Sequence, residues 1–335
     1  MGKHYRKEGR GGSRVIRLAL LLLLIAALIY VAAGRLGAPV AEKPQDSGTA
    51  AVSADRSADA KLKDREPSAS ADVAVVSLDT QKKEKEDSPA NKKPQVVDEK
   101  YGGPVPLLAL IVDDGGGQME YTKRVAALDI PLSWAIMPYL RHSKDTLELA
   151  KSKRIPCLLH LPMQAEIDKD SSQYIIGKGM DADEVRQKTA AALDSLPGVV
   201  GINNHRGSLA TADSKLMEPV MAELKERGLI FADSRTSGKS VAYQTAVAAG
   251  VPSVQNRGFL DNTADKNAIA ARFREIVKNA QRRGSLVVIC HFRPSTVMFL
   301  EELNKNYKEL PVKLVTIPEM LKLMKESSAE PEGGI

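Results

Sequence analysis

Residues 107–117 read LLALIVDDGGG, a short apolar run that ends in two aspartates and three glycines. An apolar run of this length is typical of a buried β-strand. Asp113 and Asp114 are consecutive, so in an extended strand their side chains would point to opposite faces. We expect the glycines at 115–117 to supply the bend that lets both carboxylates reach one site, because glycine tolerates positive φ.

Downstream of this run, apolar β-rich segments alternate with amphipathic segments about every 25 to 35 residues. The expected strands are Leu107 to Val112, Leu132 to Met137, Pro156 to Leu161, Val199 to Asn203, Leu229 to Asp233, Pro252 to Gln255, Leu286 to Cys290 and Lys313 to Thr316. The expected helices are Met119 to Leu128, Ser143 to Lys153, Asp181 to Leu196, Ala212 to Arg227, Val241 to Ala249, Ala264 to Arg282, Thr296 to Tyr307 and Pro318 to Lys325.

This alternation predicts an α/β fold with parallel strands covered by helices. We expect a deformed (β/α) barrel of seven to eight mostly parallel strands over residues 101–326, and a doubly wound sheet is the alternative. In either architecture, functional residues gather at the C-terminal ends of the strands.

The N-terminal region has a different texture. Residues 18–34 read LALLLLLIAALIYVAAG without a charge, and residues 1–17 hold six Lys or Arg and one acid. We expect 18–34 to be a transmembrane signal anchor, with 1–17 as a basic cytoplasmic tail and the C-terminal domain extracytoplasmic. A signal peptide cleaved after Val31-Ala32-Ala33 is the alternative. The partner of this segment would be the cytoplasmic membrane.

Residues 35–100 contain no aromatic residue and many mixed charges, which predicts a disordered linker, and 327–335 is expected to be a flexible tail. The net charge of the 335-residue chain is +6, but residues 1–17 carry +5 of it. The main domain therefore lacks the clustered cations that nucleic-acid binding requires, and no nucleic-acid partner is expected. With 24 Gly and two Cys, the chain is neither collagen-like nor disulfide-stapled.

Polar residues close the apolar runs where the strands are expected to end. Three of the five histidines do so, together with acidic and amide residues: Asp113, Asp114, His160, Asn203, Asn204, His205, Asp233, Arg235, Asp261 and His291. A single histidine in such a place is more often structural than functional. Three histidines beside an aspartate pair at one rim favour a metal site.

The ordered set LLALIVDDGG, LSWAIMPY, LLHLPMQ, GINNHRGS, FADSRTS, GFLDN and VICHFRPSTV resembles the divergent polysaccharide deacetylase family. Its relatives are carbohydrate esterases that remove N-acetyl groups from chitin-like and peptidoglycan sugars. The resemblance runs from Pro104 to about Lys325. It implies a deformed (β/α) barrel with a divalent metal, usually zinc, held by one Asp and two His.

Carried onto this chain, the resemblance implies Asp113 as the catalytic base and Asp114 as a metal ligand, with His160 and His205 as the nitrogen ligands. Better-studied deacetylases place both histidines in one HxxxxH-like segment, which this chain lacks. Relatives often end in GHxHP, where this chain has Arg293 for the second histidine.

Gln164 also stands where relatives often have Glu, which removes a potential carboxylate.

Amide hydrolysis requires an activated water, a place for the developing oxyanion and a proton for the leaving amine. We expect Asp113 to accept the proton from water and His291 to supply one to the amine, with Arg235 or Asp233 orienting these groups. Asn203, Asn204 and Asp261 are expected either to hold sugar hydroxyls or to cap strand ends and turns.

The expected function is N-deacetylation of a cell-envelope polysaccharide such as peptidoglycan by a membrane-anchored, metal-dependent hydrolase. One alternative is a weak or inactive barrel that binds glycan or an envelope protein, which Arg293 and Gln164 favour. Another is a glycoside hydrolase that uses Asp113 with Asp233 or Asp261.

Overall fold

The computed structural model describes residues 97–98, 103–169 and 171–329. The expected tail at 1–17, the anchor at 18–34 and nearly all of the linker at 35–100 lie outside the described residues. Within the described part, no helix has both the length and the apolar character needed to cross a membrane.

The elements follow each other in the order β1 (Val97–Asp98), β2 (Gly103–Pro104), β3 (Leu107–Gly115), α2 (Met119–Ala126), β4 (Ser133–Ile136), α3 (Ser143–Ser152), β5 (Cys157–Met163), η3 (Ser171–Gln173), α4 (Ala182–Ser195), β6 (Gly201–Arg206), η4 (Ala210–Ala212), α5 (Ser214–Glu226), β7 (Ile230–Asp233), α6 (Ala242–Ala249), β8 (Ser253–Gln255), α7 (Lys266–Arg283), β9 (Ser285–His291), α8 (Pro294–Leu303), η5 (Tyr307–Glu309), β10 (Lys313–Val315) and α9 (Ile317–Ala329).

The α/β prediction is confirmed, because each of the eight expected strands and eight expected helices is present at its place with small differences at the ends. The short pair β1 and β2 was not expected and is antiparallel. Helix α9 runs to Ala329, so it extends into the segment expected to be a flexible tail.

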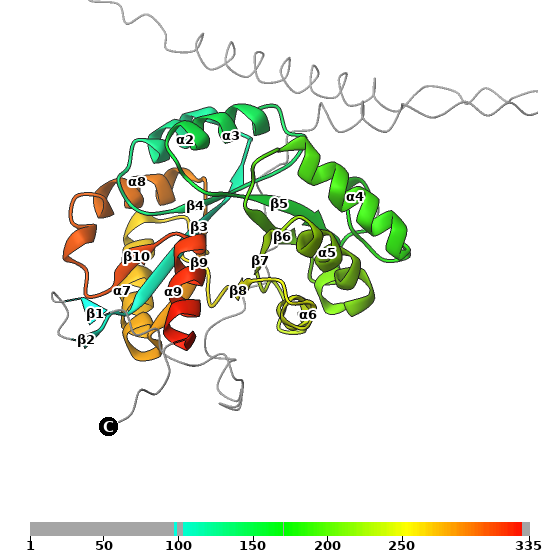
Figure 1. The fold of residues 1–335 in the computed structure, drawn as a ribbon. Coiled ribbons are helices and arrows are strands. Elements are labelled where there is room, and N and C mark those ends of the chain that lie inside the picture. The colour runs from blue at the N-terminus through cyan, green and yellow to red at the C-terminus, as the bar shows by residue number, and fades with distance from the viewer. Residues whose placement is uncertain (1–96, 99–102, 170, 330–335) are drawn as a thin grey trace, which may run out of the picture. The chain divides into compact units, whose positions relative to one another are not determined.

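The strands of the main sheet are parallel and run in the order β10-β3-β4-β5-β6-β7-β8, with β9 also paired to β3. Figure 1 shows this curved sheet with helices packed around its outside. The segment after β8 turns back to β9: Arg257 N–H donates to the Val287 carbonyl at 2.9 Å, and Leu260 N–H to the Ile289 carbonyl at 2.8 Å. The sheet is therefore a deformed barrel.

The last strand takes a different place from the one that strict alternation suggests. β10 pairs only with Leu107–Ala109, the first part of β3. The whole length from Leu107 to Asp113 instead pairs with β9. β10 and β4 therefore both pair with β3: β10 with its first part and β4 with its later part.

Side-chain alternation along each strand divides the core into two layers. Leu107, Ala109 and Ile111 belong to an inner cluster with Val287 and Ile289. The residues between them pack outward against the helices. Because side chains two residues apart share a face, the same alternation continues to the polar residues at the strand ends. It directs position 113 of β3 and position 291 of β9 toward the interior.

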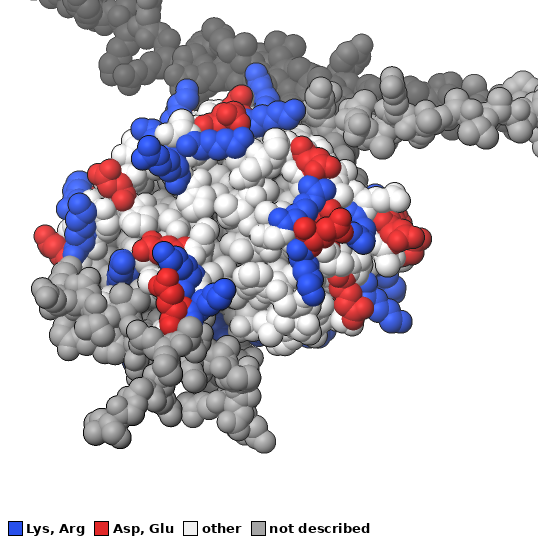
Figure 2. All heavy atoms as spheres, in the orientation of Figure 1, with Lys and Arg blue, Asp and Glu red and all other residues white. Residues whose placement is uncertain are grey.

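Charged residues cover the outside without separating by sign. Figure 2 shows Lys and Arg intermixed with Asp and Glu over this face of the molecule. Several of them form pairs between neighbouring helices, such as Arg124 of α2 with Glu301 of α8 at 2.8 Å. Such exposed pairs each contribute about 0 to 1 kcal/mol, so the fold rests on its apolar layers.

Gly201 provides a test of how closely β6 and β7 approach. A Cβ atom at this position would lie 2.2 Å from the Ile230 carbonyl oxygen, which is backbone and cannot move aside cheaply. We expect Gly201→Ala to lower the free energy of unfolding by about 1 to 3 kcal/mol or more, measured by urea denaturation. Gly238→Ala is the control, because a Cβ atom at that position would have no neighbour within 4 Å among the described residues. Equal stability of the two variants would contradict the prediction.

Candidate metal centre

Three side chains, from strands β3, β5 and β6, meet at the C-terminal edge of the sheet. Asp114 Oδ1 of β3 lies 3.4 Å from His160 Nε2 of β5 and 3.3 Å from His205 Nδ1 of β6. The two imidazole nitrogens are 3.0 Å apart. The structure therefore brings together the three residues that the sequence pattern suggested as metal ligands, although they are far apart along the chain.

The dimensions of this triangle fit a small divalent cation. Zinc bound at about 2.1 Å in a tetrahedral site places neighbouring ligand atoms about 3.4 Å apart, close to the three observed distances. Asp114 Oδ1 is buried and accepts no hydrogen bond from any described residue, although the Asp114 side chain as a whole is 36% exposed. A buried carboxylate oxygen without a hydrogen bond is a favourable position for a bound cation.

The pKa shifts of these three residues also favour a bound cation. Burial acts to raise the pKa of Asp114, but the adjacent His160 and His205 imidazoles more than offset it and hold that pKa well below its usual range. Burial lowers the pKa of His205, which favours the neutral form that binds metal. At His160, burial acts to lower the pKa, yet the nearby carboxylates of Asp113 and Asp114 raise it. The carboxylates of Asp113 and Asp114 therefore favour a positive charge next to the two histidines.

Asn203 sets the orientation of His160. Its amide Nδ2 donates to Asp113 Oδ1 at 2.8 Å, so its Oδ1 is the atom that faces His160 Nδ1 at 2.9 Å. The His160 Nδ1 must then carry the proton, which leaves the Nε2 lone pair directed at Asp114 and His205. A buried amide that fixes the tautomer of a metal-binding histidine is a common arrangement around metal sites.

The bend that brings both aspartates to one site occurs at Asp114 itself. Its φ is +66°, and Gly116 follows with φ +104°. The sequence led us to expect the glycines alone to supply the bend, whereas the left-handed residue is the second aspartate. Tyr139 and Arg235, which follow β4 and β7, and Arg206, the last residue of β6, also have positive φ, whereas Arg154 with positive φ precedes β5. Such strained backbone collects at functional sites, which supports this edge as the site.

Asp113 lies behind the triangle, deep in the inner layer. It is 2% exposed, and its Oδ2 is 3.6 Å from His160 Nε2. Burial raises the pKa of Asp113 above its usual value, although the positive charges of His160 and His291 act against this rise. A buried carboxylate with a raised pKa is well suited to accept a proton.

His291 faces Asp113 across the β3–β9 ladder, where the two are direct partners. Its Nδ1 is 2.8 Å from Asp261 Oδ1, and Thr296 Oγ1 donates to Asp261 Oδ2 at 2.6 Å. Burial acts to lower the pKa of His291, but the Asp261 carboxylate overcomes it and raises that pKa to about 9. His291 is therefore protonated at neutral pH and able to donate a proton.

The three residues expected either to hold sugar hydroxyls or to cap strand ends are all buried. Asn203 binds His160 and Asp113, as described above. Asn204 is 1% exposed, accepts from Ser234 N–H at 2.8 Å and donates to the Arg206 carbonyl at 2.7 Å. Asp261 is 1% exposed and bound to His291. These contacts bind other residues of the protein, and sugar binding by the three residues stays a prediction.

The two remaining expected residues hold the loop after β7. Asp233 accepts from Arg235 N–H at 2.8 Å, from Ser240 Oγ at 2.8 Å and from Tyr243 N–H at 3.3 Å. The Arg235 guanidinium contacts Gln255 Oε1 at 3.2 Å. These contacts lie in this loop and in β8, and an orienting role of the two residues toward Asp113 or His291 stays a prediction.

Gln164, which departs from the usual family pattern, also has a clear place. Its side-chain Oε1 accepts from Lys178 N–H at 2.7 Å, and its carbonyl accepts from Leu209 and Ala210 N–H at 3.1 and 3.0 Å. It therefore joins the loop after β5 to the segment after β6. The Gln164 side-chain oxygen thus serves as a structural acceptor at this position.

Two contributors escaped the sequence reasoning. Thr296 orients Asp261, and Asp168 binds Arg206 next to His205 with 2.5 Å between Oδ1 and Nη2. A threonine at the start of a helix and an aspartate in a loop both resemble ordinary caps and turns, so the sequence carries no signal that distinguishes them.

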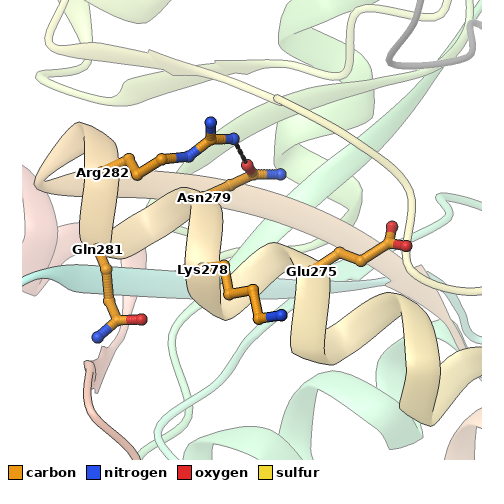
Figure 3. Close-up of a pocket in the computed structure, with 5 residues that line it drawn as sticks. All are labelled: Glu275, Lys278, Asn279, Gln281 and Arg282. Atoms are coloured by element: carbon orange, nitrogen blue, oxygen red, sulfur yellow. Dashed lines mark hydrogen bonds between the residues drawn. The ribbon is translucent and has the colours of Figure 1, made fainter.

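A separate hollow lies on α7, at the opposite end of the barrel. Figure 3 shows its lining side chains, which all come from this helix, with Arg282 in contact with Asn279. They belong to the second half of α7, which leads into the beginning of β9, whereas the histidines lie at strand C-termini. The hollow has no part in the candidate centre.

Fold and site together define an α/β barrel protein with a candidate divalent-metal centre at the C-terminal edge of its sheet. A family model described as divergent polysaccharide deacetylase matches residues 110–321. The chain belongs to this family, as the sequence resemblance predicted.

Two relatives cover the same domain. An uncharacterized protein of Haemophilus influenzae is 34% identical over 202 residues, which is 60% of this chain and 72% of that protein. The uncharacterized protein YibQ of Escherichia coli is 31% identical over 199 residues, or 59% of this chain and 62% of that protein. The match thus spans less than two thirds of YibQ.

The crystal structure of an uncharacterized protein from Agrobacterium tumefaciens has a similar fold. It superposes with a TM-score of 0.61 at 17% identity, covering 69% of this chain and 99% of that one.

Proposed function

We propose that this protein is a membrane-anchored, extracytoplasmic, metal-dependent hydrolase that removes N-acetyl groups from a cell-envelope polysaccharide such as peptidoglycan. The observation that carries the proposal is the meeting of Asp114 Oδ1, His160 Nε2 and His205 Nδ1 beside Asp113 and His291. Membership of the family supports the substrate class. The apolar segment 18–34 and its basic flank support the anchor.

Asp114, His160 and His205 would hold the metal, for which zinc is the proposal because one carboxylate and two imidazoles suit it. When bound, the metal lowers the pKa of water and polarises the acetamide carbonyl. Asp113 then accepts the proton of the attacking water. Asn203 keeps both Asp113 and His160 in place through its amide.

His291 supplies the proton that the departing amine requires. Its pKa of about 9 keeps the imidazolium charged at neutral pH, and the Asp261–Thr296 pair holds Nδ1 so that Nε2 is the donor. Asp113 and His291 are cross-strand partners, so acceptor and donor lie on the same inner face of the sheet. General acid and base steps of this kind are each worth about 100 to 10,000-fold in rate.

The full-length protein in detergent, loaded with zinc, is the material for the direct test. We expect acetate release from N-acetylated glycan fragments, measured by an enzyme-coupled acetate assay, and loss of release after chelation. Bound metal without acetate release across several N-acetylated glycans would instead favour the alternative, a glycan-binding barrel. Arg293, which replaces a histidine common in relatives, is the residue that favours this alternative.

The pH dependence follows from the His291–Asp261 pair. Folding raises the pKa of His291 from 6.5 to about 9, so the activity of the wild type falls as pH rises through about 9. Asp261→Asn removes the charge that raises this pKa, so the fall moves to lower pH. The profile of kcat/KM against pH measures the shift, and an NMR titration of the imidazole assigns it to His291.

Asp145→Asn is the matched control for this prediction. Asp145 forms an exposed pair with His142 at 3.0 Å, so its loss also removes a carboxylate from a histidine. We expect that variant to keep the wild-type profile. An unshifted profile in Asp261→Asn would contradict the assignment.

The His291–Asp261 pair also contributes to the stability of the fold. The folded chain binds the His291 proton more tightly than the unfolded chain. The pair therefore stabilises the fold fully below about pH 6.5, and this contribution is lost as pH rises through about 9.

A further inference from the structure

His205 is held differently from the other nitrogen ligand. The His160 side chain is 3% exposed and bound by Asn203, whereas the His205 side chain is 28% exposed. The His205 ring contacts the edge of the His160 ring, with 4.8 Å between centroids. Burial therefore fixes His160 but not His205, so the position of His205 depends more on the backbone that carries it.

The backbone turns sharply at the next residue. Arg206 has φ +56°, a conformation that side chains other than glycine rarely adopt. In this turn its carbonyl accepts from Asn204 Nδ2 at 2.7 Å and from Thr236 Oγ1 at 2.8 Å. Backbone of this kind persists only where surrounding contacts hold it.

The side chain of Arg206 supplies such contacts. Its Nη2 lies 2.5 Å from Asp168 Oδ1, and its Nη1 donates to Gln173 Oε1 at 2.7 Å. The Asp168 side chain is 1% exposed, and its Oδ2 accepts from Ala165 N–H at 2.7 Å. A guanidinium that is shared between two acceptors is fixed in direction as well as position.

The ion pair joins the two segments that follow the histidine-bearing strands. Asp168 lies in the loop between β5, which carries His160, and α4, and Arg206 ends β6, which carries His205. The same loop is tied to the segment after β6 at Glu166, whose N–H donates to Ser208 Oγ at 2.9 Å. The pair thus fastens one ligand-bearing strand end to the other.

We propose that Arg206 and Asp168 are positioning residues, which act through the backbone to keep His205 Nδ1 turned toward Asp114 and His160. This inference rests on the metal centre of the proposed function. According to this inference, the loop between β5 and α4, which carries Asp168, contributes to metal affinity although it holds no metal ligand.

The test is a calorimetric titration of the metal-free full-length chain with zinc alone. Arg206→Gln and Asp168→Asn are each expected to lower zinc affinity about 10 to 100-fold, the range for groups that orient metal ligands. The visible spectrum of the cobalt-substituted protein is expected to change in both variants, because it reports ligand geometry.

Arg186→Gln is the matched control. Arg186 also binds two side chains, Glu223 at 3.3 Å and Glu226, but on α4 and α5. It should leave zinc affinity and the cobalt spectrum unchanged. Should Arg206→Gln fail to fold by circular dichroism, Arg206→Lys keeps the charge and loses the two-acceptor contact, with an expected loss of about 3 to 10-fold.

The outcomes separate the two proposals. A wild-type chain that binds no zinc overturns the proposed function. A wild type that binds zinc, together with folded Arg206 and Asp168 variants that bind it equally well, overturns this inference alone.

Discussion

His160→Gln is expected to abolish zinc binding by the full-length chain and, with it, hydrolysis of N-acetylated glycans. His160 Nε2 is one of the three proposed ligand atoms. The other ring nitrogen, Nδ1, is bound to Asn203, so it cannot take the place of Nε2 as a ligand. Loss of a residue that orients a metal ligand typically lowers metal affinity about 10 to 100-fold. Removal of the ligand itself should lower zinc affinity by more than this. Metal content after dialysis and calorimetric titration measure the loss.

His142→Gln is the control for this prediction. It removes a histidine of the same domain that forms an exposed pair with Asp145 and lies outside the centre. That variant should retain one zinc per chain. Full zinc binding by His160→Gln would mean that the three residues meet for a reason unrelated to metal.

Asp113→Asn is expected to lower kcat by about 100 to 10,000-fold while zinc remains bound. The amide has the shape of the carboxylate but cannot accept a proton, so the base is lost and Asp114, His160 and His205 are left intact. Because the group acts only in the transition state, kcat and kcat/KM should fall together. Steady-state acetate release and metal content from the same preparation provide the measurement.

Asp194→Asn serves as the control for Asp113→Asn. Asp194 is an exposed partner of Arg227 on the outside of the barrel, and its loss should leave both kcat and zinc content unchanged. Retention of wild-type kcat in Asp113→Asn would require a different base. The buried Asp233 is bound by Ser240 in the loop after β7, and the buried Asp261 is bound by His291 and Thr296.

Local patterns were sufficient for most of the fold. Apolar runs and amphipathic segments reflect burial that is set within each element, and their alternation leaves few topologies. The pairing of β10 with only the first part of β3 could not be predicted in this way, because an apolar run indicates a strand but not the residues with which that strand pairs. The segment 18–34 stays a prediction, since it lies outside the described residues.

The candidate centre was predictable in its members and less so in its geometry. Asp114, His160 and His205 were among the polar residues that close apolar runs, whose ends parallel strands bring together, and the family resemblance singled them out as the ligands. The positive φ of Asp114 and the partnership of Asp168 with Arg206 depend on contacts between distant segments. Local residue preferences do not encode such contacts, so these features required coordinates.

The direct pairing of Asp113 with His291 in the β3–β9 ladder bears on how this scaffold could be re-engineered. Their spacing is set by main-chain hydrogen bonds between two central strands, and the connecting loops do not enter into it. Loops grafted from other barrels onto this edge, with Asp168 and Asp261 retained, could then alter which glycan is admitted while the proton acceptor and donor stay in register. Glycan selectivity could then be changed without altering the spacing of these two groups.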